Sequence, residues 1–393
     1  MKINFKDRKT QLIIMSVAGL LLLAFIIPSI CISVSRNNRT VKIAFVNLPE
    51  KITAPIQKQI TNVQSKDIKF EVINEDKVYI RKLAKYNMII TWNGKIPNLL
   101  KDSIQPISKD IPMLIPSAIK KSTLIDNDKE ILPLLLDHYE IAYYRTYRKA
   151  NNLGIPGSLK GLENYMQVIK EKATYPLIVQ GATDSELLGF VSVVASSIYD
   201  DKQYDKLVKD VSKFVDSQKE LPKSLNTVLD KIREWQKEGL IHPQWTDVIA
   251  SDTELFMREH QLGSICMSLS EHREKEFVLI KYYDAIAFPR NTNIPNHYLI
   301  APEVVAIPLK SKVNLNRILE TLINPQTQSE LSTKTQLSAC ASRAESYDSL
   351  SDDVRFWAAS YASGPAPDIG RACCKDPTEE KFLADKIREA VRK

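Results

Sequence analysis

A long apolar run close to the N-terminus constrains this chain more than any other feature of its sequence. Residues 12–32 contain no charged side chain, and basic residues from Lys2 to Lys9 precede them. About 20 apolar residues are enough to cross a bilayer as a helix, and flanking positive charge stays on the cytoplasmic side. We therefore expect residues 1–33 to be a membrane anchor or signal segment, with the rest of the chain folded outside the cytoplasm.

The sequence leaves the fate of this segment open. The run is longer than the roughly 7 to 15 apolar residues of a secretory signal, and no A-x-A site follows it. An uncleaved anchor is one interpretation. Residues 27–31 (IPSIC) are similar to a lipoprotein cleavage site, so lipidation of Cys31 is a second, although Ile30 is larger than the residue usual there. Ordinary cleavage is a third.

Several classes of function lack their sequence signals here. Glycine is scarce, at 11 in 393 residues, and neither a G-x-G-x-x-G nor a P-loop motif occurs. The five histidines are scattered without a metal-binding spacing, and the S-x-x-K match at Ser117 to Lys120 lacks its companion motifs. The formal charge of +7, partly in the N-terminal segment, is too weak for nucleic-acid binding. We therefore expect no enzymatic activity, cofactor, metal site or nucleic-acid partner.

Four cysteines follow the N-terminal segment, in a compartment that permits disulfides. We expect Cys340 to pair with Cys373 or Cys374, because all three lie in the C-terminal part that has helical patterns. Cys266 lies in an apolar, strand-like run and is predicted to be a buried free thiol.

Short β-rich runs alternate with helical patterns along the chain. Ser158 is a candidate helix N-cap, apolar residues recur at helical spacing before Gly239 and before Pro325, and the last sixty residues have almost entirely helical patterns. This alternation predicts an α/β fold with largely parallel sheets. The predicted strands are residues 41–46, 70–73, 87–92, 175–179, 264–267, 284–288 and 304–308.

From Ile131 onward, short motifs follow one another in a particular order. Residues 132–144 (LPLLLDHYEIAYY) form a proline-led strand that ends in an aromatic pair, and residues 154–158 (GIPGS) lead into a helix. The later motifs are EGLIHP at 238–243, GSICM at 263–267, FPR at 288–290, VAIPLKSK at 305–312 and NPQTQ at 324–328. In this order and spacing, the chain resembles the extracellular solute-binding proteins of the maltose-binding type, the receptor components of ABC importers.

The resemblance implies a two-lobe periplasmic-binding-protein fold of type II, behind the N-terminal membrane segment. It places lobe one at residues 40–136 and 286–328, and lobe two at residues 137–285 and 329–393. It also implies that the chain crosses between the lobes near residues 134–142 and 284–306.

The function implied is that of the extracytoplasmic substrate-binding component of an ABC importer, which captures a carbohydrate in the cleft between its lobes. The expected partners are the solute, the ABC permease subunits, and the membrane through residues 12–32. The expected location is the extracytoplasmic face of a bacterial cytoplasmic membrane. The alternative is a membrane-anchored sensory or scaffolding protein that uses the same fold without transport.

Ligand-contacting residues of such a fold should lie just after strands or on the crossovers, because the cleft lies at the carboxyl ends of strands. Each also has a plainer interpretation: Trp92 as a packing residue, Asp137 and His138 as hinge residues that satisfy backbone groups, and Arg290 as a surface charge. The candidate ligand-binding residues are Trp92, Asn93, Asp137, His138, Tyr139, Thr183, Asp184, Ser270, Glu271 and Arg290.

Overall fold

The computed structural model describes residues 40–63, 68–108, 114–125 and 129–392. No helix within these ranges is both long enough and apolar enough to cross a membrane. The membrane segment expected at residues 12–32, including Cys31, lies outside the described residues.

The first main β-sheet is six-stranded, with the order β13-β6-β12-β3-β1-β2. β1 pairs in parallel with β2 and β3, whereas β12 runs antiparallel to both β3 and β6, and β13 runs antiparallel to β6. The strands are β1 (Val41–Val46), β2 (Ile68–Ile73), β3 (Met88–Trp92), β6 (Leu132–Leu136), β12 (Glu303–Pro308) and β13 (Ser338–Ala339). We call this sheet and the elements packed on it the first lobe.

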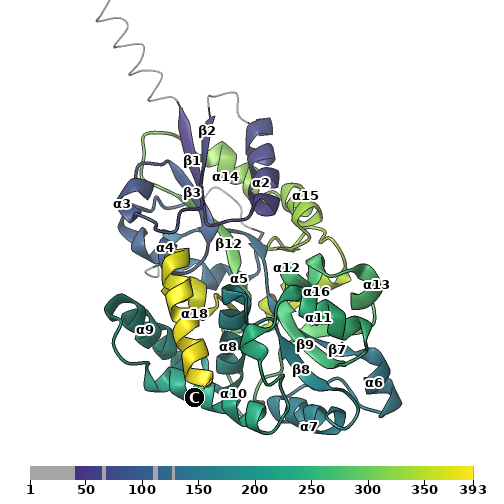
Figure 1. The fold of residues 1–393 in the computed structure, drawn as a ribbon. Coiled ribbons are helices and arrows are strands. Elements are labelled where there is room, and N and C mark those ends of the chain that lie inside the picture. Colours follow the sequence, from purple (N-terminus) through teal and green to yellow (C-terminus); the bar gives the residue numbers. More distant parts are fainter. Residues whose placement is uncertain (1–39, 64–67, 109–113, 126–128, 393) are drawn as a thin grey trace, which may run out of the picture.

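The second main sheet is four-stranded, with the order β10-β7-β9-β8. β8 and β9 are parallel, and β7 runs antiparallel to both β9 and β10. The strands are β7 (Tyr139–Tyr144), β8 (Tyr175–Val179), β9 (Leu262–Ser268) and β10 (Tyr283–Ala287). This sheet and the elements packed on it form the second lobe, below the first in Figure 1.

Both sheets are covered on both faces, which explains why their strands are apolar runs without clear alternation. Along β1, Ile43 and Phe45 belong to one buried cluster, while Ala44 and Val46 belong to the cluster on the opposite face. The same division holds along β7, where Ile141 and Ala142 face different clusters. The core of each lobe therefore lies on either side of its own sheet.

Helices cover these faces (Figure 1). The first lobe holds α2 (Glu50–Val63), α3 (Ile80–Leu83), α4 (Lys95–Leu99), η1 (Lys101–Ser103), α5 (Ser117–Ser122), α14 (Asn316–Ile323), α15 (Pro325–Thr335) and α16 (Ser349–Ser360). The second lobe holds α6 (Arg145–Ala150), α7 (Leu159–Ile169), α8 (Asp184–Ile198), α9 (Asp201–Ser217), α10 (Lys223–Lys237), η2 (Trp245–Asp247), α11 (Ala250–Arg258), α13 (Phe277–Ile280), α17 (Ile369–Cys373) and α18 (Pro377–Val391). α12 (Leu269–Glu274) directly follows β9 of the second sheet, but its Leu269 is buried in the core of the first lobe. Two short pairs complete the fold: β4 (Leu124–Ile125) with β5 (Lys129–Glu130), and β11 (Leu299–Ile300) with β14 (Pro365–Ala366).

Within the described residues, the chain crosses between the lobes three times. It leaves the first sheet between β6 and β7 and returns between β10 and β12, so both predicted crossovers are confirmed. It crosses again between α16, whose Val354 packs in the first lobe, and α17, whose Ile369 packs in the second.

This third crossing corrects the predicted assignment of residues 329–393 to lobe two. β13 pairs with β6 of the first sheet, and Leu331 and Val354 are buried in the core of the first lobe. Among the described residues after 329, those that pack in the core of the second lobe begin at Ala366 of β14 and continue through α17 and α18. The helical pattern showed which face of each helix is buried but not against which lobe that face packs.

The predicted disulfide is not formed. All four cysteines in the described part of the chain are free and buried. Cys340 lies in the core of the first lobe, whereas Cys373 and Cys374 lie in that of the second. The prediction was wrong because it treated the C-terminal part as one unit, whereas the third crossing separates Cys340 from Cys373 and Cys374.

Candidate functional site

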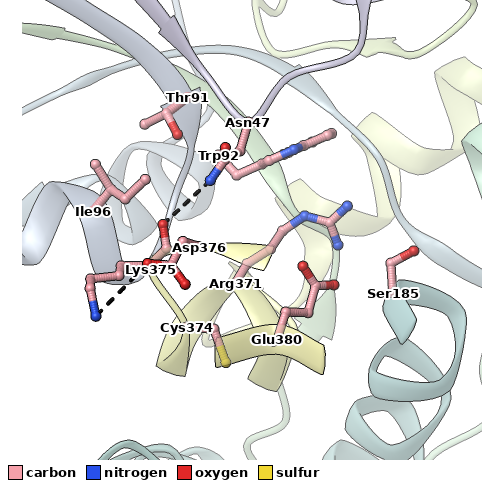
Figure 2. A pocket seen from close by; sticks show the side chains of 11 residues that line it. Asn47, Thr91, Trp92, Ile96, Ser185, Arg371, Cys374, Lys375, Asp376 and Glu380 are labelled. Atoms are coloured by element: carbon pink, nitrogen blue, oxygen red, sulfur yellow. Dashed lines mark hydrogen bonds and ion pairs between the residues drawn. The ribbon is translucent and has the colours of Figure 1, made fainter. Parts of the chain in front are cut away.

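A cavity of about 240 Å³ lies between the lobes. Figure 2 shows side chains from both lobes pointing toward it, together with several from the C-terminal segment. The first lobe contributes Asn47, Thr91, Trp92 and Ile96, the second contributes Ser185 from α8, and the C-terminal segment contributes Gly370, Arg371, Cys374, Lys375, Asp376 and Glu380.

Strand topology places the residues of the first lobe. β1 and β3 are parallel neighbours, so the ends of both strands meet at one edge of the sheet. Trp92 ends β3, and Asn47 follows β1 with a φ of 52°, a left-handed conformation that asparagine tolerates. Gly94 then turns the chain into α4 with a φ of 139°. A Cβ there would lie 2.2 Å from the carbonyl oxygen of Arg371, so the C-terminal segment approaches this turn closely.

The C-terminal segment spans the mouth of the cleft, and we call residues 368–380 the C-terminal clasp. On the second lobe, α18 is held by Arg388, which donates to the carbonyl oxygen of Gly181 at 2.9 Å and pairs with Asp184 at 2.7 Å. The N-terminal end of α18 contacts the first lobe (Figure 1). The Thr378 hydroxyl donates to the carbonyl oxygen of Asp76 at 2.7 Å, and the Val78 amide donates to Asp376 at 3.1 Å. The Asn47 side-chain amide donates to the Lys375 carbonyl at 3.3 Å.

Arg371 is the central charge of the clasp. Its guanidinium lies 4.3 Å from the centre of the Trp92 ring, forms an ion pair with Asp368 and donates to the Tyr139 hydroxyl at 3.4 Å. Desolvation lowers its pKa, but Asp368, Tyr139 and Asp137 together raise that pKa well above the usual range. Arg371 is therefore permanently charged, and its charge is balanced inside the protein.

Glu380 places a carboxylate at the edge of the cavity. Burial raises its pKa to about 7, although the nearby Arg371 charge opposes the shift. In the part of the chain that the structure describes, this carboxylate accepts no hydrogen bond from another residue. The buried Oδ1 atom of Asn47 also has no partner there. Buried polar atoms are normally paired, so the unpaired Asn47 oxygen is available to a ligand. The Glu380 carboxylate, on a partly buried residue, is available as well.

Of the predicted ligand-binding residues, Trp92 lines this cavity. Asn93 instead points into the first lobe and is only 4% exposed, with its amide donating to Glu303 at 2.7 Å. Asp137 is buried and accepts hydrogen bonds from the backbone amide and hydroxyl of Ser270, at 2.9 and 2.7 Å. His138 is fully buried against Trp357, with 5.2 Å between the ring centres.

The remaining predicted residues lie around the cleft without lining this cavity. Tyr139 donates to the carbonyl oxygen of Ser185 at 2.8 Å, and Arg290 stacks on Tyr361; these two line a second, very small cavity. Thr183 is the residue before α8, Asp184 pairs with Arg388, and Glu271 pairs with Lys275. Ligand contact by these residues stays a prediction.

Sequence reasoning missed Asn47, Ser185, Arg371 and Glu380. Asn47 directly follows the strand predicted at residues 41–46, so the rule that selected residues at strand ends would also have found it. Arg371 and Glu380 lie in helices that return to the cleft from the far end of the chain, and no local pattern reports that return. Within the described ranges, no cluster of His, Cys, Asp and Glu side chains is suited to a metal ion.

No protein-family model matches the sequence, and no curated protein matches it. Solved structures do match the fold of this chain. The bacterial solute receptor AcbH, described as having an exclusive preference for β-D-galactopyranose, is 12% identical with a TM-score of 0.71, over 90% of this chain and 97% of that one. The binding protein MsmE of Bacillus subtilis, in an open conformation, is 12% identical with a TM-score of 0.70, over 90% and 93%.

A third structure is a sugar transporter of Bacillus licheniformis in complex with stachyose. It is 13% identical with a TM-score of 0.61, over 90% of this chain and 97% of that one. The three likenesses show that this chain has the mixed α/β fold of two-lobe solute-binding proteins.

Proposed function

We propose that this protein is the extracytoplasmic substrate-binding component of an ABC importer, and that it captures a carbohydrate between its lobes without covalent chemistry. The observation that carries the proposal is the cavity at the strand ends of one lobe, which faces the other lobe and is lined by polar groups together with an aromatic ring. Two proteins with the same fold bind sugars according to their descriptions: one is a receptor for β-D-galactopyranose, and the other was solved in complex with stachyose.

The chemistry of the cavity suits a polyhydroxyl ligand. The Glu380 carboxylate and the Asn47 carbonyl oxygen can accept hydrogen bonds from ligand hydroxyls, and the Ser185 hydroxyl can donate one. Trp92 offers a ring on which the apolar face of a sugar can pack. These groups bind by hydrogen bonding and packing alone, which is what a receptor that releases its solute unchanged requires.

The proposal includes a place and partners. Residues 12–32 would hold the protein at the outer face of a bacterial cytoplasmic membrane, as an uncleaved anchor or through a lipid on Cys31. The ABC permease subunits would receive the solute there. A sensory or scaffolding protein with the same fold would need the anchor but no solute.

A thermal-shift screen with mono- and oligosaccharides separates these functions. A receptor gains about 2.7 kcal/mol of stability when its ligand is present at about 100 times the dissociation constant, because the ligand binds only the folded state. We expect at least one carbohydrate to raise the melting temperature by roughly a few degrees. If no carbohydrate does so, the scaffolding alternative replaces this proposal.

Calorimetric titration of variants then locates the site. We expect Trp92→Ala to weaken binding about 10-fold, because the loss of a packed ring costs roughly 1 to 1.5 kcal/mol. Tyr282→Ala, which removes a 43% exposed ring on the surface of the second lobe, is the control and should bind like the parent. Equal affinities for the parent and both variants would place the ligand elsewhere.

A further inference from the structure

The size of the cavity limits what can bind in it. Pockets for drug-sized ligands usually occupy about 300 to 1,000 Å³, and a cavity of about 150 Å³ holds a bare six-membered ring such as benzene. The cavity here, at about 240 Å³, lies between these values. It has room for one substituted ring and not for a chain of rings.

The clasp sets this size. The backbone of Arg371 packs against Gly94 of the first lobe, and its guanidinium covers one side of the Trp92 ring. Beyond it, Asp376 and Thr378 bind the first lobe at residues 76–78. A longer ligand could extend past Trp92 only by displacing this side chain and these hydrogen bonds.

The charges of the cavity are nearly all balanced by the protein itself. Arg371 is paired with Asp368, and Lys375 with Glu379. Asp376 accepts backbone hydrogen bonds from Val78 and Glu379. Glu380 is the lining charge without a direct partner among the described residues, although the field of Arg371 reaches it. A ligand carboxylate would be repelled by Glu380, and a ligand ammonium by the neighbouring Arg371.

We propose that the cavity selects a neutral, polyhydroxylated ligand of a single ring, with the clasp setting its size and Glu380 excluding acidic analogues. The inference rests on the proposed carbohydrate-binding function and narrows it to neutral monosaccharides. The Glu380 carboxylate accepts ligand hydroxyls through charge-assisted hydrogen bonds, which are stronger than neutral ones.

Calorimetric titration of the full chain in detergent tests the size and charge of the ligand, at about pH 8.5 so that Glu380, with a pKa of about 7, is ionised. The probes are the neutral monosaccharides D-galactose, D-glucose and D-xylose, then D-galacturonic and D-glucuronic acids, and the oligosaccharides raffinose and stachyose. We expect a neutral monosaccharide to bind at least 100-fold more tightly than its acid and than both oligosaccharides. Tighter binding of stachyose or of an acid would overturn this inference and leave carbohydrate capture standing. Binding of no probe, including the oligosaccharides, would overturn both.

Glu380→Gln tests the role assigned to the carboxylate, and it keeps the size of the side chain. We expect about 10-fold weaker binding of the neutral monosaccharide and at least 10-fold tighter binding of the acid, while stachyose stays excluded. Glu389→Gln, on the exposed side of the same helix, is the matched control and should behave like the parent. An unchanged ratio of acid to neutral affinities in Glu380→Gln, with a parent-like circular dichroism spectrum, would refute the role of Glu380.

Discussion

Glu303 of β12 is a buried carboxyl group held entirely within the first lobe. It is 0% exposed, and it accepts hydrogen bonds from Asn93 and Ser122, both at 2.7 Å. Burial is the largest influence and raises its pKa to about 7, although the two hydrogen bonds oppose the shift. Glu186 of α8 is in the same situation, with a pKa raised to about 7 by burial. These groups bind protons more tightly in the folded state than in the unfolded chain.

The raised pKa of Glu303 predicts a pH dependence of stability. Its contribution is fully present below the ordinary pKa of 4.5 and is lost as the pH rises through about 7. We expect Glu303→Gln to gain stability relative to the parent by roughly 2 kcal/mol between pH 4.5 and pH 8, because the amide does not ionise. Urea denaturation at several pH values measures this difference. Glu220→Gln, at an exposed position, is the control and should follow the parent; a parallel course for Glu303→Gln would contradict the prediction.

Trp92 and Asn93 show what the sequence could and could not reveal about single residues. Both were predicted at the cleft because they end a strand. The structure separates these two neighbours. Trp92 faces the cavity, whereas Asn93 is turned inward to Glu303. The sequence does not indicate which of the two faces the cavity, because Glu303, the partner of Asn93, is 210 residues away along the chain.

At the scale of elements, one side chain both caps α18 and joins it to the first lobe. Asp376 caps α18 by accepting from the Glu379 amide at 3.1 Å, and it also accepts from the Val78 amide of the first lobe at 3.1 Å. Asp200 caps α9 within the second lobe: it accepts from the Gln203 amide at 2.8 Å, and the Gln203 side chain accepts from the Asp200 amide at 3.1 Å. Both aspartates cap a helix, but only Asp376 also bonds to the other lobe. Comparing variants at the two positions therefore distinguishes the effect of the cap from that of the contact between lobes.

We expect Asp376→Ala to lower the free energy of unfolding by about 2 kcal/mol, of which about 1 is the cap and about 1 the lost Val78 hydrogen bond. Asp200→Ala should cost about 1 kcal/mol. Hydrogen exchange gives the sharper readout, because only Asp376→Ala should speed exchange of the Val78 amide. Equal exchange at Val78 in both variants would show that the hydrogen bond between Val78 and Asp376 is not made in solution.

The predicted bounds of helices and strands agree closely with the observed ones where the elements are long and buried. The strand predicted at residues 175–179 is β8 with the same bounds, and Ser158 caps α7 by accepting from the Gly161 amide at 3.1 Å. Gly239, with a φ of 66°, follows the end of α10 as predicted. β13 was not predicted, because two residues carry no periodicity. That strand is what ties the segment after α15 to the first sheet.

At the scale of the whole molecule, the lobes are connected in two ways. The three crossings join them covalently, and side chains form contacts between them. Lys95 of α4 donates to the Ser212 hydroxyl of α9 at 2.6 Å, with Asp216 at 3.3 Å, and the Lys95 side chain is only 12% exposed. Lys51 of α2 pairs with Glu274 of α12 at 2.7 Å, but these side chains are 41% and 64% exposed. The two lysines make similar bridges in different surroundings.

These surroundings predict different effects on closure. Exposed ion pairs contribute at most about 1 kcal/mol, whereas a largely buried charged hydrogen bond contributes roughly 1.5 to 3 kcal/mol. We expect Lys95→Met to shift the ligand-free protein toward a more open arrangement and to weaken carbohydrate binding about 10-fold, because apparent affinity falls with the closed fraction. Lys51→Met should change affinity by no more than about 3-fold.

Energy transfer between dyes attached at Lys58→Cys in the first lobe and Lys160→Cys in the second, in a Cys31→Ser background, measures the opening. The four buried cysteines should not react with the dyes. If Lys95→Met leaves the transfer efficiency at the parent value, the contact does not hold the lobes together, and the clasp with the crossings must be sufficient.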